Sequence, residues 1–216
     1  MKKMNIYFCG LAACMLAMAS CTDNFDETNT NPNKITVSSG KLEASAMFEQ
    51  TLYGSANFFT YYSWFWCDEL IQHTAHTGGT TRQEHRYFIG DQNWKALWNT
   101  YLRYASNDVN MIKLAEAQGA SYLQAVGLTM KVLFMSNLTD IYGDIPYKEA
   151  FMAEEGIKQP VFDSQENVYQ QMCAELEEAN RIYASKPYVE EKNRKLDGMY
   201  NFDMTKWQKF NNSLYL

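Results

Sequence analysis

This chain of 216 residues has little proline, few cysteines and no excess of basic residues. Its four prolines leave long segments free to form helices, because proline removes a backbone hydrogen bond and kinks a helix. The net charge of −6 argues against nucleic acid as a partner, since nucleic-acid-binding proteins present a basic face. The sequence also has no Gly-x-Ser-x-Gly element, no phosphate-binding loop and no dinucleotide fingerprint, so none of these enzyme classes is indicated.

Long apolar runs are missing as well. No apolar stretch reaches the roughly 20 residues that a membrane-spanning helix needs. The nearest, residues 4–20, follows two lysines and ends in Met-Ala-Ser-Cys at residues 18–21. A charged start, an apolar middle and small residues before a cleavage point are the layout of a secretory signal peptide. The Met-Ala-Ser-Cys ending resembles the lipobox of bacterial lipoproteins, which implies cleavage before Cys21 and its acylation. Cleavage without acylation is the alternative.

Lipid on Cys21 is therefore the expected membrane anchor, and stable attachment takes two or more acyl chains. Loss of the leader leaves 17 of the 19 basic residues against 25 acidic ones, a net charge of −8. Such a protein gains nothing from anionic headgroups. Acids soon after Cys21 resemble, in dilute form, an export signal of some Bacteroidetes lipoproteins, and a solvated linker explains them equally well. We expect a signal peptide over residues 1–20, a lipidated N-terminus and polar tether over residues 21–34, and a helical domain over residues 35–216.

Two cysteines, Cys67 and Cys173, remain in the domain. An oxidising compartment would permit a disulfide between them. Their neighbours are typical of helix faces, where a free cysteine behaves as a small apolar residue. We expect both to be unpaired and largely buried.

Apolar residues recur every three or four positions through most of the domain, which predicts an all-α fold. A short turn at Gly119 is expected to join two of the helices as antiparallel neighbours. Long loops are expected over residues 72–92 and 185–204. The predicted helices cover residues 41–52, 56–71, 94–112, 122–134 and 168–183, and a last one follows residue 204.

Single residues mark the expected ends of these helices. Gly54 is expected to interrupt the first helix, and Asp163 with Glu166 to form a capping pair. Thr205 is expected to cap the last helix. That helix ends on apolar residues without a cap, so we expect the sequence to be cut short and a partner helix to be missing.

Three stretches carry a resemblance to a known family. They are Leu-Thr-Asp-Ile-Tyr-Gly-Asp-Ile-Pro-Tyr-Lys-Glu-Ala at residues 138–150, Pro-Val-Phe-Asp-Ser-Gln-Glu-Asn-Val-Tyr at 160–169, and Asp-Met-Thr-Lys-Trp-Gln-Lys-Phe-Asn-Asn-Ser-Leu at 203–214. With the lipobox and the Asn-Pro-Asn element at 31–33, the chain resembles the N-terminal part of SusD/RagB-type outer-membrane lipoproteins. The signature residues are Asp140, Tyr142, Gly143, Asp144, Pro146, Tyr147 and Trp207.

The resemblance implies a fold of tetratricopeptide-like helix pairs with long loops, of which the C-terminal part is missing here. It implies a surface-exposed lipoprotein of the outer membrane that acts as a lid on a TonB-dependent (SusC-like) transporter. Such proteins capture oligosaccharides or other nutrients, use no cofactor and are not enzymes. A helical scaffold for protein partners, with no small-molecule ligand, is the alternative function.

Candidate ligand-binding residues lie in the aromatic run and in the polar loop after it. Flat sugar faces suit aromatic platforms, so Tyr61, Trp64 and Trp66, with their neighbour Tyr62, are candidates for stacking. Packing in the core is the alternative for each, because large aromatic residues are highly buried on average.

The loop candidates are His73, His76 and Arg82, which can bind sugar hydroxyls or contact the transporter. A His-x-x-His pair also occurs in zinc sites, but the loop supplies no defined third ligand, and we expect no metal. Paired carboxylates serve glycoside hydrolysis. For Asp140 and Asp144, however, capping of a turn is the favoured interpretation.

Overall fold

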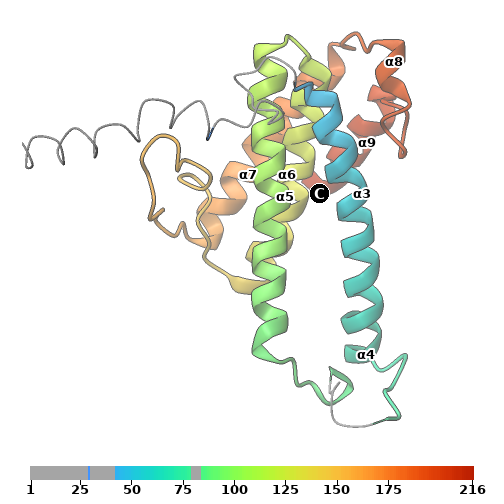
Figure 1. The fold of residues 1–216 in the computed structure, drawn as a ribbon, viewed down its shortest axis with the longest axis vertical. Coiled ribbons are helices and arrows are strands. Elements are labelled where there is room, and N and C mark those ends of the chain that lie inside the picture. Colours follow the sequence, from blue (N-terminus) through green and yellow to red (C-terminus); the bar gives the residue numbers. More distant parts are fainter. Residues whose placement is uncertain (1–28, 30–41, 79–83) are drawn as a thin grey trace, which may run out of the picture. The chain divides into compact units, whose positions relative to one another are not determined.

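Long helices account for most of the structure (Figure 1). The computed structural model describes residue 29, residues 42–78 and residues 84–216. The chain divides into two units, Met1–Leu42 and Glu43–Leu216, and all that follows concerns the second. The expectations for Cys21, Arg82, the tether and the Asn-Pro-Asn element lie outside the described residues.

The first long helix is continuous through Gly54. Helix α3 (Ala44–Tyr62) runs directly into a π-helical turn, η2 (Ser63–Cys67), and then into the short α4 (Asp68–Leu70). The predicted break at Gly54 is therefore wrong. This glycine provides space instead: a Cβ atom there would lie 2.6 Å from the hydroxyl oxygen of Tyr104, so its absence lets Tyr104 approach the backbone of α3.

The predicted hairpin around Gly119 is confirmed. Helices α5 (Asp91–Ala117) and α6 (Ser121–Tyr142) pack against each other, and Gly119 has a φ of +68°. The N–H of Ala120 donates to the carbonyl of Ala115 at 2.8 Å, and that of Gly119 donates to Glu116 at 3.1 Å. This Schellman pattern satisfies carbonyls at the end of α5 and turns the chain back on itself.

The later helices begin one or two residues from the predicted caps. Helix α7 (Gln165–Ala184) is capped by Ser164, whose hydroxyl accepts the N–H of Asn167 at 3.4 Å. A short 3-10 turn, η3 (Glu84–Arg86), and the helices α8 (Glu191–Arg194) and α9 (Met204–Tyr215) complete the elements. Asp203, and not Thr205, caps α9 by accepting two backbone N–H groups. The capping pair predicted at Asp163 and Glu166 is wrong, because Ser164 occupies the cap position.

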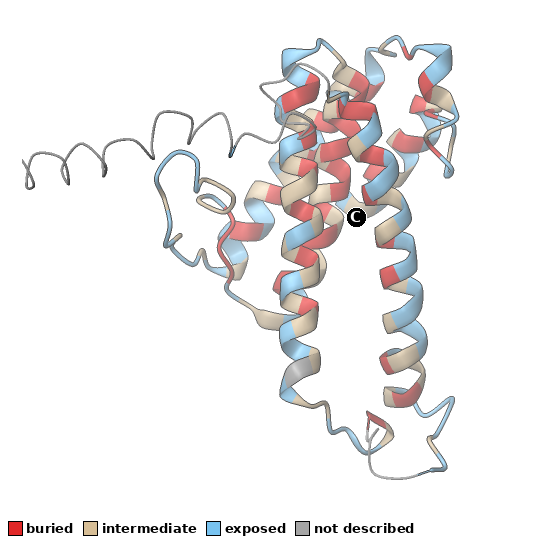
Figure 2. Ribbon diagram, in the orientation of Figure 1, coloured by how far each residue is buried: buried red, intermediate tan, exposed pale blue. Residues whose placement is uncertain are grey.

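Helix α6 lies at the centre of the packing. It contacts α5 and α7 most extensively and also touches α3 and α9. Buried residues concentrate where these helices meet (Figure 2). The ring of Phe48 on α3 lies 4.9 Å from that of Phe202 and 5.9 Å from that of Trp207, so the first and last described helices share one core. The fold is all-α with tetratricopeptide-like helix pairs and long loops, as the sequence predicts.

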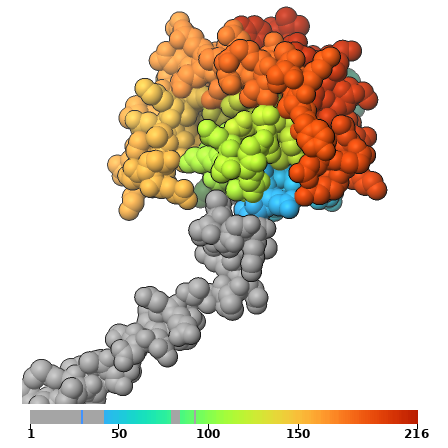
Figure 3. All heavy atoms as spheres, turned by 90° about the horizontal axis from the view of Figure 1, so that it is seen from above, coloured from blue at the N-terminus to red at the C-terminus, as the bar shows by residue number. Residues whose placement is uncertain are grey.

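The segment before α9 is more ordered than a plain loop. The fully buried carboxylate of Asp197 accepts the indole N–H of Trp207 at 2.8 Å. It also accepts the backbone N–H groups of Met199, Tyr200 and Phe202. Asn193 donates to the hydroxyl of Tyr122 at 2.9 Å. Seen from above, this segment covers one end of the helical unit, near the start of α3 (Figure 3).

Among the described residues there is no strand, only an antiparallel bridge between Ile145 and Asp163. Within the same residues, none of the helices combines the length and the apolar character that crossing a membrane requires. Cys67 and Cys173 are unpaired, as expected. Cys67 is exposed, however, so the expectation that it is largely buried is wrong, and Cys173 is only half-buried. It lies in the π-helical turn, which shifts the faces of the helix relative to the α-helical period.

Candidate functional site

The aromatic run of α3 and η2 has an inner row that packs toward α5. Phe58, Tyr62 and Trp66 follow one another at intervals of four residues. The ring of Phe58 lies 5.1 Å from that of Tyr101, and the ring of Trp66 lies 5.6 Å from that of Trp94. Trp66 is only 6% exposed. The structure thus places this candidate residue in the packing between helices, where it has no accessible face for a sugar ring.

The same run has an outer group, which we call the exposed aromatic cluster: Tyr61, Trp64 and Phe65. Tyr61 is 47% exposed and Trp64 is 56% exposed. The rings of Tyr61 and Phe65 stack at 5.2 Å with an angle of 22°, and Trp64 meets Tyr61 edge-on at 6.3 Å. The π-helical turn carries Trp64 and Phe65, and such turns occur frequently at functional sites. The cluster offers aromatic surface to a ligand while Trp66 stays inside.

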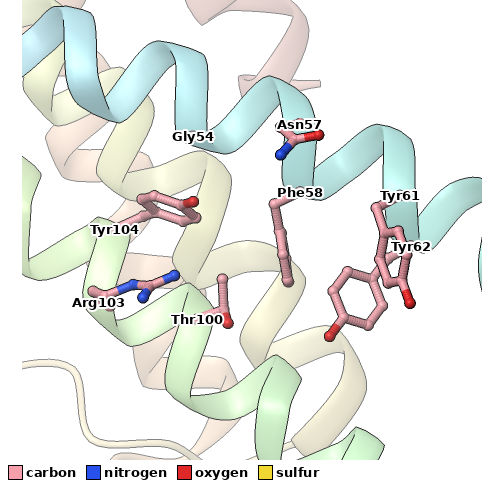
Figure 4. Close-up of a pocket in the computed structure, with 8 residues that line it drawn as sticks. All are labelled: Gly54, Asn57, Phe58, Tyr61, Tyr62, Thr100, Arg103 and Tyr104. Atoms are coloured by element: carbon pink, nitrogen blue, oxygen red, sulfur yellow. The ribbon is translucent and has the colours of Figure 1, made fainter.

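A hollow of about 260 Å³ lies beside this cluster, between α3 and α5. Figure 4 shows its walls: Asn57 and Tyr61 come from the α3 side, and Thr100 and Arg103 come from the α5 side. The guanidinium carbon of Arg103 lies 5.3 Å from the centre of the Tyr104 ring. The hollow is lined by Gly54, Asn57, Phe58, Tyr61, Tyr62, Thr100, Arg103 and Tyr104.

A second, more open hollow of about 460 Å³ adjoins Trp64. Its lining adds two hydroxyl groups and a carboxylate to the aromatic surface. Together the two hollows flank the exposed aromatic cluster and combine ring faces with hydrogen-bonding groups. This is the composition that suits polar, ring-bearing ligands. The second hollow is lined by Phe59, Thr60, Ser63, Trp64 and Asp68.

Burial affects the phenol groups of two tyrosines at and beside the first hollow. Burial, with a smaller contribution from Tyr61, raises the pKa of Tyr62 above its usual value of 10.0. Burial likewise raises the pKa of the neighbouring Tyr101 to about 12. Both of these phenols keep their protons at neutral pH. Among the described residues, Arg103 is the only Lys, Arg, His, Asp or Glu side chain that lines this hollow.

The loop candidates lie at the far end of α4. His73 is exposed and His76 is partly exposed. The N–H of His73 donates to the carbonyl of Asp68 at 2.9 Å. Neither histidine lines the two hollows. Over residues 42–78 and 84–216, no three His, Cys, Asp or Glu side chains converge in a way that would hold a metal ion.

The signature residues hold the connection between α6 and α7. At the end of α6, the hydroxyl of Tyr142 donates to the carbonyl of Trp94 on the neighbouring α5 at 2.5 Å. Asp144 accepts the N–H of Gln165, the first residue of α7, at 2.9 Å. Gly143, with a φ of +76°, ends α6, and the buried Pro146 follows it.

Two other signature residues bond to α7. The hydroxyl of Tyr147 donates to Glu175 at 2.8 Å, and Asp140 accepts the hydroxyl of Tyr169 at 2.5 Å. The carboxylates of Asp140 and Asp144 therefore have partners within the protein that tie α7 to the end of α6.

Sequence reasoning missed the α5 side of the first hollow. Thr100, Arg103 and Tyr104 lie on a helix whose pattern indicates only core and surface. Their role depends on which residues of α3 they face, and antiparallel pairing decides that. The one signal available was Gly54, a glycine within a helical pattern, which marks a close approach.

The chain was compared with known proteins. The model of the SusD-like family, described as "Starch-binding associating with outer membrane", matches residues 32–216. No functionally curated protein matches the chain.

Several solved structures have the same fold. A SusD/RagB family protein of Bacteroides thetaiotaomicron has a TM-score of 0.66 at 18% identity, over 81% of this chain and 37% of its own. A SusD homologue of Bacteroides fragilis has a TM-score of 0.59 at 22% identity, over 81% of this chain and 34% of its own. A SusD-like protein of Bacteroides thetaiotaomicron has a TM-score of 0.59 at 20% identity, over 79% of this chain and 36% of its own. This chain spans about a third of the length of these proteins, and the likeness concerns the fold.

Proposed function

Because the chain belongs to the SusD-like family, whose description is starch-binding in association with the outer membrane, we propose that it binds a glycan nutrient at the cell surface. In this proposal it is a lipoprotein that delivers its ligand to a TonB-dependent, SusC-like transporter. It raises the local ligand concentration and performs no bond chemistry.

The observation that carries the proposal is the exposed aromatic cluster between two hollows. Tyr61 and Trp64 leave large ring surfaces in solvent, whereas Phe58 and Trp66 of the same run are buried. Sugar rings have apolar faces and polar edges, so rings in the cluster can stack on the faces. Side chains such as Asn57 and Thr100 can bond to the hydroxyls. The candidates Tyr61 and Trp64 thus remain the proposed contacts, whereas the buried Trp66 packs against Tyr62 and Trp94.

The membrane attachment in this proposal comes from the sequence alone. Cys21 follows the leader and carries the acyl chains, and residues 21–34 form the tether to the helical domain. The loop histidines His73 and His76, with Arg82, are proposed to contact the ligand or the transporter.

Calorimetric titration with oligosaccharides selected on a glycan array tests the proposal. Tyr61→Ala and Trp64→Ala should each weaken binding about fivefold to a hundredfold, because aromatic contacts of this kind contribute on the order of 1–3 kcal/mol. Tyr53→Ala is the matched control: Tyr53 is an aromatic residue on the same helix, 78% exposed, that lines neither hollow. Absence of binding to every glycan would refute the proposal, and equal losses in all three variants would refute the site.

A further inference from the structure

The two hollows beside the exposed aromatic cluster differ in charge. The hollow between α3 and α5 has one cationic side chain, Arg103, and no carboxylate in its lining. The second hollow has one carboxylate, Asp68, and no cation. The first hollow is therefore a local positive site in a chain whose net charge is −6.

Arg103 has no ion-pair partner within the described part of the chain. Its side chain is exposed, and its recorded contact is the face of Tyr104. By contrast, Arg181 and Arg194 each pair with a glutamate three residues away on their own helices. A guanidinium group stacked on an aromatic ring keeps its N–H groups available in a fixed plane, which suits bidentate binding of a carboxylate.

The position of Arg103 is set by the packing of the two helices. Tyr104 lies against the backbone of α3 because Gly54 has no Cβ atom. Figure 4 shows Arg103 beside Tyr104 and Thr100 on the α5 side of the hollow. On the α3 side, Asn57 supplies a hydrogen-bonding group and Tyr61 supplies a ring. At about 260 Å³ the hollow lies just below the usual size range of small-molecule sites, which favours a single sugar unit over a long stretch of chain.

We propose that the hollow between α3 and α5 binds an acidic sugar unit, whose carboxylate is held by Arg103 and whose ring lies against Tyr61. The inference rests on the proposed glycan-binding function and narrows it: the preferred ligands are oligosaccharides with uronate or sialate units. Starch-type glucans, which have no carboxylate, leave Arg103 unused.

The test is titration with acidic oligosaccharides and their methyl esters, in which the sugar is kept and the charge is removed. Oligogalacturonate, an oligosaccharide of glucuronate units and sialyllactose are the acidic probes, and maltooligosaccharides are the neutral ones. At least one acid should bind about tenfold or more tightly than its ester, since hydrogen bonds between ionised groups are the strong ones. Added salt should reduce that difference.

Arg103→Gln should remove the preference for the acid, so that the acid and its ester bind with similar affinity. Arg103→Lys should keep only part of the preference for the acid, because an ammonium group cannot bind a carboxylate in the bidentate geometry of a guanidinium group. Arg181→Gln, which removes an exposed arginine on another helix, is the control and should change neither affinity. Thermal melting of each variant shows that the fold is retained.

Three outcomes overturn the inference, and they differ in what they say about the proposed function. If neutral glucans bind in a Tyr61-dependent way and acids bind no better, the glycan-binding function stands and the acidic ligand is wrong. If Arg103→Gln keeps the preference for the acid, the carboxylate is bound elsewhere. If no glycan binds at all, or only acidic peptides bind, both fail together.

Discussion

Asp108 shows how a single residue can act against the stability of the fold. It lies on α5 with 0% exposure, and within residues 42–78 and 84–216 neither of its carboxylate oxygens has a hydrogen-bond partner. Burial raises its pKa well above the usual 3.8, because an unpartnered carboxylate is costly to ionise in an apolar surrounding. The folded protein therefore holds a proton here that the unfolded chain releases.

This shift makes the free energy of unfolding depend on pH. Below about pH 4, Asp108 is protonated in both states, and its full contribution is present. As pH rises toward the raised pKa, the unfolded state is favoured because it ionises more easily. Asp108→Asn cannot ionise, so the loss of stability that Asp108 causes between pH 4 and pH 7 should be absent from this variant.

Denaturant titrations at a series of pH values measure this difference. Glu116→Gln, an exposed change on the same helix, serves as the control and should retain the pH dependence of the wild type. If the free energy of unfolding of Asp108→Asn varied with pH as it does in the wild type, another group would be responsible for that pH dependence.

At the scale of elements, helix types were easier to predict than helix ends. The apolar periodicity of residues 94–112 and 122–134 identifies α5 and α6, and Gly119 identifies the turn between them. Sequence reasoning predicted a break at Gly54 because glycine is a poor helix former. Packing overrides that tendency, since buried residues recur on α3 from Ala44 to Phe58 and Gly54 accommodates Tyr104.

The residue that caps α9 in the structure is Asp203, whereas the sequence alone predicts Thr205. The carboxylate of Asp203 accepts the N–H groups of Thr205 at 2.9 Å and Lys206 at 3.2 Å. Asp203→Ala should therefore lower the free energy of unfolding by about 1 kcal/mol, whereas Asp203→Asn should retain most of it.

Thr205→Ala, the change at the sequence-predicted cap, should have little effect on the same measurement. Thermal or urea unfolding of the three variants decides between the two positions. A larger loss in Thr205→Ala than in Asp203→Ala would favour the prediction from sequence over the structure.

At the scale of the whole molecule, the proposed function assigns attachment and ligand binding to different parts of the chain. The leader and Cys21 precede the helical unit, while the hollows are built by α3, η2 and α5. The net charge that the proposed cleavage before Cys21 would leave, −8, would provide no attraction to anionic headgroups. In our proposal the acyl chains on Cys21 are thus the sole attachment to lipid.

Cys21→Ala should move the protein from the membrane fraction to the soluble fraction of cells that lack the transporter. Cys67→Ala, which removes an exposed thiol within the helical unit, should leave the protein in the membrane fraction. Fractionation followed by immunoblotting measures both. Retention of Cys21→Ala in membranes without the transporter would refute the proposed anchor.

The amino-acid order by itself determined the helical class, the hairpin at Gly119 and the expected leader, since each depends on residues that are close in sequence. It also identified Tyr61 and Trp64 as candidates, although not which rings of the run face solvent. The cap of α9 is a local feature as well, since Asp203 bonds to residues two and three positions further on. The tertiary structure decided that Trp66 packs inside and that Arg103 and Asn57 line one hollow. Both features depend on the way α3 and η2 pack against α5, which arises from contacts between residues far apart in the chain.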